Sequence, residues 1–167
     1  MTTRGCRMKP AVKSVRAASD PEKQLQGFIA KFEPKQQALI ASARKALRKR
    51  FPTANELVYD NYNFFVIGYS PTEKPSDSIV SLAAGASGVG LSFPYVGARL
   101  PDPHKLLQGA GSKNRFIRLP SADELARPEV EALIAAALRL CKTLPGAGKG
   151  NLIIRSISAK QRPRRKG

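Results

Sequence analysis

The sequence predicts an α+β domain: an antiparallel sheet of four to six strands packed on about three helices, with flexible basic termini. Three features of the 167 residues lead to this prediction. Helical periodicity comes first, short β-branched and aromatic segments fill the middle, and one more helical segment follows them. The strict alternation of strands and helices found in doubly wound sheets is absent, so a parallel α/β fold is not expected.

Two helices are expected to open the domain. Asp20 suits a helix N-cap and Pro21 the first helical position. Apolar residues then recur at helical spacing, in the order Leu25, Phe28, Ile29 and Phe32. Pro34 begins a second helix that ends before Pro52. The outer face of this second helix is expected to bear the basic residues Lys35, Arg44, Lys45, Arg48 and Lys49.

Short strands are expected from residue 55 onward. Their residues are mostly β-branched, aromatic or otherwise apolar, and the segments are 56–59, 63–69, 78–84, 89–93 and 114–119. Two prolines in residues 70–77 indicate a loop. The sequence GASG at 85–88 supplies the small residues of a tight turn, so the strands on either side of it should form an antiparallel hairpin.

A last helix is expected to begin at Pro128, with its buried face formed by Val130, Leu133, Ile134, Ala137, Leu138 and Cys141. The chain then divides into three parts. Residues 1–19 are expected to form a disordered basic arm, residues 20–143 the folded domain, and residues 144–167 a tail. The tail should contain a Gly/Pro linker, an edge strand at 151–157 and ten final residues that are too polar to pack.

Positive charge is concentrated at the two ends of the chain. The formal net charge is +17, and residues 1–19 and 142–167 contain 13 of the 29 Lys and Arg residues but no Asp or Glu. A cation that contacts a phosphate releases a condensed counterion, so such ends attract polyanions. We therefore expect weak, non-specific nucleic-acid binding through the tail, with a merely solubilising tail as the alternative. The candidate contacts are Arg162, Arg164, Arg165 and Lys166.

Several chemistries lack the residues that they require. Cys6 and Cys141 match no disulfide framework or zinc spacing, and His104 is the only histidine, so neither a metal site nor a cofactor is expected. Neither a Gly-x-Ser-x-Gly elbow nor a P-loop occurs, and no catalytic residue is assigned. No apolar run approaches the roughly 20 residues of a membrane span. Two incidental thiols are typical of a reduced, cytoplasmic protein.

The most polar point of the strand region is the segment 59–63, which contains two phenols, two amides and a carboxylate. These groups suit a pocket for a small polar ligand, and the alternative is an Asx-type turn between two strands. The glycine-rich loop before residue 114 offers backbone amides to an anion, and a plain connecting loop is its alternative. Together the candidate pocket residues are Tyr59, Asp60, Asn61, Tyr62, Asn63, Lys113 and Arg115.

A family resemblance runs through the same region. The run Tyr59 to Asn63 is followed by Ile67-Gly68-Tyr69 and the proline-bearing loop, and Leu100-Pro101-Asp102-Pro103 precedes the segment LLQGAG. In this order the motifs, which span about residues 20–141, resemble the YdhG-like family of unknown function. The resemblance implies a small α+β fold shared with frataxin-like and YjbR-like domains. It implies no established reaction, although some relatives have been linked to intracellular iron delivery.

Three functions follow from these observations. The first is a non-enzymatic binding module, in which the folded domain binds an unknown small ligand or protein and the basic tail adds weak polyanion affinity. The second is a frataxin-like iron carrier, which the family resemblance implies. Iron binding of that kind needs carboxylates, and the first two helical segments offer only Asp20, Glu22 and Glu33. The third is an enzyme that uses the polar segment 59–63.

Overall fold

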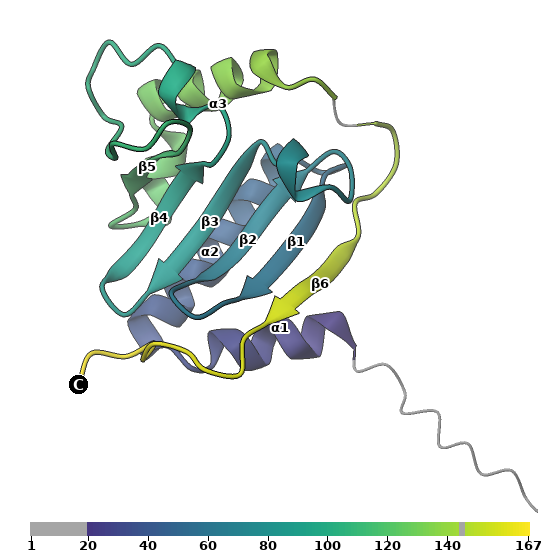
Figure 1. The fold of residues 1–167 in the computed structure, drawn as a ribbon, viewed down its shortest axis with the longest axis vertical. Coiled ribbons are helices and arrows are strands. Elements are labelled where there is room, and N and C mark those ends of the chain that lie inside the picture. Colours follow the sequence, from purple (N-terminus) through teal and green to yellow (C-terminus); the bar gives the residue numbers. More distant parts are fainter. Residues whose placement is uncertain (1–19, 144–145) are drawn as a thin grey trace, which may run out of the picture.

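A six-stranded sheet with α2 behind it forms the centre of the domain (Figure 1). The computed structural model describes residues 20–143 and 146–167, so the arm expected at 1–19 and part of the expected linker lie outside the described residues. Three α-helices occur in the described part, α1 (Pro21–Ile29), α2 (Pro34–Arg50) and α3 (Pro128–Leu140). The strands are β1 (Asn55–Asp60), β2 (Phe65–Ser70), β3 (Val80–Gly85), β4 (Gly88–Phe93), β5 (Arg115–Arg118) and β6 (Leu152–Ile157). The predicted α+β class is confirmed.

The strand order is β5-β4-β3-β2-β1-β6. The first five strands pair antiparallel with their neighbours. β6 lies at the edge, as expected for 151–157, but it pairs parallel to β1, with Val58 opposite Ile154. The expected antiparallel pairing thus holds from β1 to β5 but not for β6. A long connection that includes α3 precedes β6, and only a connection of this kind allows a strand to return in the parallel direction.

The two faces of the sheet differ in what covers them. Paired residues share a face, and one row across five strands consists of Val58, Ile67, Leu82, Leu91 and Ile117, which are all buried. This face contacts the helices: α2 crosses it, and Phe28 and Phe32 pack near Phe65 with ring centroids 6.2 and 6.0 Å apart. We refer to the opposite side, which faces the viewer in Figure 1, as the open face.

Arg44 ties α1, α2 and β1 together beneath the covered face. Its Nε donates to Glu56 Oε2 at 2.9 Å, and its Nη1 donates to Glu22 Oε1 at 2.7 Å. The Tyr69 hydroxyl also donates to Glu56, at 3.0 Å. Only 7% of Arg44 is exposed, so its expected place on the outer face of the second helix is wrong. Helical periodicity could not show that two carboxylates from other segments would enclose this guanidinium.

Ionisation of this network is favoured in the folded state. Burial acts to lower the pKa of Arg44, but hydrogen bonds to Glu56 and Glu22 outweigh it, so its pKa is raised. The hydrogen bond from Arg44 lowers the pKa of Glu22 to about 2, against the opposing effect of burial. Arg44 and Glu22 are therefore both charged at neutral pH, which is the state that their ion pair requires.

Removing Arg44 should destabilise the domain strongly. We expect Arg44→Ala to lower the free energy of unfolding by about 3–5 kcal/mol, because Glu56 would remain buried with only the 3.6 Å contact to the half-exposed Arg48 as its counter-charge. Urea denaturation measures this difference. Lys45→Ala removes the same charge from an exposed position on the same helix and should change stability by no more than about 0.5 kcal/mol. Equal effects of the two substitutions would show that the buried pair is not a major stabilising contact.

The depressed pKa of Glu22 gives its contact with Arg44 a defined pH range. Because the folded pKa lies below the unfolded value, the contribution is complete above about pH 4.5 and is lost as the pH falls towards about 2. We expect the wild-type chain to lose more stability than Glu22→Gln between pH 5 and pH 2. Parallel stability curves, from urea titrations at several pH values, would contradict this.

Candidate functional site

The segment 59–63 forms the end of β1 and the turn into β2. The Asn61 amide donates to Phe64 O at 3.0 Å, which closes the turn, while Tyr59 and Asp60 belong to the strand itself. Successive strand residues point to opposite faces, so Asp60 lies on the covered face and Tyr59 on the open face. Burial raises the pKa of Tyr59, and the nearby positive charge of Arg155 opposes that shift. The segment thus joins two strands, and its polar groups do not converge on one pocket.

Asp60 anchors the C-terminal tail. Its side chain is fully buried and accepts from Lys31 Nζ at 2.6 Å and from Arg164 Nη2 at 2.9 Å. Gln161 Nε2 donates to the Asp60 carbonyl oxygen at 2.9 Å. We call these four residues the Asp60 clasp. Burial acts to raise the pKa of Asp60, but hydrogen bonds from Lys31, Gln161 and Arg164 outweigh it and the pKa is lowered.

The rest of the tail also lies against the domain. The Arg162 amide donates to Tyr62 O at 2.8 Å, and its guanidinium lies over the Tyr62 ring, 5.8 Å from the centroid. Arg165 Nε donates to Lys31 O at 3.1 Å. The expectation that the final ten residues are too polar to pack is therefore wrong. Arg164 Nη2 donates to a buried carboxylate, and Arg162 and Arg165 donate to backbone carbonyls, and composition alone does not reveal these contacts.

These contacts change which tail cations are free to meet a ligand. Arg164 is 4% exposed and its charge is used by Asp60, so it is not available as a nucleic-acid contact. Arg162, Arg165 and Lys166 remain exposed. The tail therefore presents its remaining cations from a surface that is fixed to the domain.

The expected ligand pocket is divided between two distant places. Tyr59 and Asp60 belong to β1, whereas Arg115 begins β5, and three strands lie between β1 and β5. Arg115 donates to the carbonyl oxygens of Gly111 and Asn114 and so stabilises its own loop. Lys113 lines a separate cavity of about 550 Å³. The grouping of residues 59–63 with Lys113 and Arg115 is therefore a wrong prediction, because the strand order between them was not foreseen.

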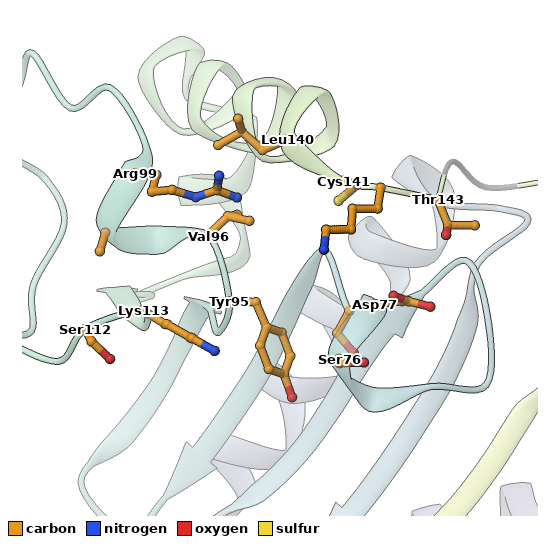
Figure 2. A pocket seen from close by; sticks show the side chains of 13 residues that line it. Ser76, Asp77, Tyr95, Val96, Arg99, Ser112, Lys113, Leu140, Cys141 and Thr143 are labelled. Carbon is orange, nitrogen blue, oxygen red and sulfur yellow. The ribbon is translucent and has the colours of Figure 1, made fainter.

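Lys113 shares that cavity with two other basic residues, Arg99 and Lys142. We call the cavity the cationic cleft. Arg99 and Lys113 extend from one side of it, Asp77 and Ser76 line the opposite side, and Tyr95 lies between them (Figure 2). None of the three cations has a hydrogen-bond or ion-pair partner within the part of the chain that the structure describes. Asp77 is the one carboxylate in the lining, and it already accepts from Thr72 at 2.7 Å.

The fold brings the cleft residues together from distant parts of the sequence. Arg99 ends the 3₁₀ helix η2 (Gly97–Arg99), Lys113 precedes β5, and Lys142 follows α3. The amide of Ala98, the residue before Arg99, donates to Lys113 O at 2.9 Å. This hydrogen bond fixes the backbone at Arg99 relative to the backbone at Lys113. Gly97 makes this approach feasible, because a Cβ there would lie 2.4 Å from the Arg115 amide nitrogen.

Cys141 also lines the cleft but is not suited to nucleophilic chemistry. Burial raises the pKa of its thiol, with a further increase from the charge of Asp77. The sulfur donates to Ala137 O at 3.2 Å. Both effects favour the thiol over the thiolate, which is the reactive form. Cys141 is therefore not suited to attack a substrate from this cleft.

Sequence reasoning found one of the three cleft cations, Lys113, and missed Arg99 and Lys142. Each of the missed residues is a single basic residue beside a loop, and no spacing rule links positions so far apart. Within the described residues no group of three or more His, Cys, Asp or Glu residues could hold a metal ion. No helix among the described residues is both long enough and apolar enough to cross a bilayer.

Comparison with known proteins adds no relatives: no family model, curated protein or solved structure matches this chain.

Replacing Asp60 should release the tail. We expect Asp60→Asn to increase hydrogen exchange at the Ser158 and Arg162 amides by on the order of 100-fold or more, because Arg164 would lose its buried counter-charge. Exchange measured by mass spectrometry reports this directly. Asp123→Asn removes the same charge from an exposed position and should leave the tail protected. Continued protection in Asp60→Asn would show that the clasp does not anchor the tail.

Proposed function

We propose that this chain is a non-enzymatic binding module of the YdhG-like type, and that its cationic cleft binds a phosphate-bearing polyanion. The observation behind the proposal is the convergence of Arg99, Lys113 and Lys142 on one cavity without partners among the described residues. Like charges that line one cavity raise the local positive potential, which attracts an anion. Phosphate oxygens accept several charge-assisted hydrogen bonds at once, so they suit such a site.

Hydroxyl groups in the same lining complement the charge. Ser76, Ser112 and Thr143 line the cleft together with the cations, and each hydroxyl is able to donate to a phosphate oxygen. The exposed tail residues Arg162, Arg165 and Lys166 would extend contact with a long polyanion, which gives the tail a secondary part in binding. Neither surface offers a base-reading motif, so this electrostatic contribution is independent of sequence.

The two alternative functions have less support. An enzyme based on segment 59–63 would need Asp60 to exchange protons, but this carboxylate is fully buried and hydrogen-bonded to two cations. An iron carrier would need clustered carboxylates, and no observation on the described residues favours one. The binding module therefore remains the function that the geometry supports best.

Titration of the full chain with inorganic polyphosphate tests the proposal. We expect the triple variant Arg99→Ala, Lys113→Ala, Lys142→Ala to bind more weakly. Its slope of log K against log salt should fall by about 2, since each lost phosphate contact removes roughly 0.7. Calorimetry at several salt concentrations gives both quantities.

The matched control removes three other exposed lysines, Lys23, Lys35 and Lys45, which lie on α1 and α2. It lowers the net charge by the same amount and should retain most of the affinity. If the control loses as much affinity as the cleft variant, binding follows net charge alone and the cleft is not the site. Absence of any polyphosphate binding would also reject the proposal.

A further inference from the structure

The open face of the sheet contains a groove that the cleft proposal does not use. Its volume is about 440 Å³, and it lies over β3 and β4. Phe64 and Val66 line it from the β2 side, and Phe116 and Arg118 line it from β5. We call this feature the open-face groove.

Small side chains make the groove hollow. Along β3 and β4 its floor consists of Ser81, Ala83, Gly90 and Ser92, whose pairing partners also lie on the open face. None of these side chains extends beyond a hydroxymethyl group. A Cβ at Gly90 would lie 3.1 Å from Ile117 O, so the floor at this point has little room for a side chain. The walls stand above this floor because only the flanking strands bear large residues.

The walls present aromatic rings to solvent. Phe64 is 51% exposed, although burying a phenyl ring would be favourable by roughly 2 kcal/mol. Its ring packs against Gly85. A Cβ at this position would lie 3.2 Å from Phe64 Cδ1, so the glycine lets the ring approach the strand closely. Phe116 stands on the opposite wall and is partly exposed. Exposed rings at the two sides of a shallow groove offer surfaces on which planar groups stack.

Charge in the groove has one sign. Arg118 is exposed and has no hydrogen-bond or ion-pair partner among the described residues, and no carboxylate lines the groove. The groove also adjoins the cationic cleft: Pro94 and Asn114 line the groove, while their chain neighbours Tyr95 and Lys113 line the cleft. A ligand that suits both sites would therefore combine flat rings with negative charge.

We propose that single-stranded nucleic acid binds across the open face, with bases stacked on Phe64 and Phe116 and phosphates held by Arg118 and by Lys113 of the cleft. This inference rests on the proposed function and specifies its ligand. Bases supply planar rings and the backbone supplies regularly spaced charge, which matches the arrangement of rings and cations. An acidic protein has no repeating unit that pairs each ring with a charge, and duplex DNA keeps its bases stacked inside, so a single strand matches the phenyl walls and cations better than either.

Binding of a fluorescein-labelled dT₁₂ strand to the full chain tests this inference. We expect Phe64→Leu and Phe116→Leu each to weaken dT₁₂ binding by about fivefold or more, because leucine is apolar but has no ring face for stacking. The same variants should bind inorganic polyphosphate, and a twelve-residue abasic strand, as tightly as the wild-type chain does. Thermal unfolding of each variant shows whether the fold is retained.

A tryptophan reporter gives a second, direct readout. The chain contains no tryptophan, so Phe64→Trp would place a single fluorophore in the groove wall. Its emission should be quenched by dT₁₂ and unaffected by polyphosphate, because only a stacked base contacts the ring. Quenching by both ligands, or by neither, would contradict stacking at this position.

The outcomes separate this inference from the proposed function. If the leucine variants lose affinity for dT₁₂ and for polyphosphate equally, the rings support the structure of the domain instead of contacting bases, and the inference is wrong. If they weaken neither, while the triple cleft variant weakens both, the groove is not a base site and the proposed function stands. If a dT₁₂ duplex with dA₁₂ binds more tightly than the single strand, the open-face groove is not the contact. If no polyanion binds, both proposals fail.

Discussion

The buried carboxylate of Asp60 is the contact on which the arrangement of both chain ends depends. A fully buried aspartate is stable only when it is paired, and its partners come from the turn after α1 and from the last residues of the chain. Lys31 thereby fixes the end of α1, and Arg164 fixes the tail against β1. The tail becomes part of the folded domain, so the directions in which its free cations point are set by the fold.

The difference between the two sheet faces decides where a ligand is able to bind. The covered face is filled by helices and contains buried apolar rows together with the paired Arg44 and Glu56. Its charges are already satisfied and contribute to stability. The cationic cleft and the open-face groove contain cations without described partners. The cations of the cleft and the exposed rings of the groove are the features from which the binding proposals arise.

Local patterns predicted the elements well but not their partners. Asp20 caps α1 as expected, with its side chain accepting from the Glu22 amide at 3.1 Å, and Pro34, Pro52 and Pro128 lie at helix boundaries. The GASG turn does join two antiparallel strands. Arg44, Arg164 and the pocket that combined Asp60 with Lys113 were wrongly interpreted. In each case the decisive contact joins residues far apart in the sequence, which periodicity and composition do not register.

By itself the sequence determined the α+β class, most of the strands and helices, and the strong positive charge, because these follow from local propensity and from counting ionisable groups. Tertiary structure decided which charged side chains form ion pairs and which do not. It paired Arg44 and Arg164 with buried carboxylates, and it collected Arg99, Lys113 and Lys142 around one cavity. The physical reason is that electrostatic energy depends on distance and burial, and both are fixed only when the chain folds.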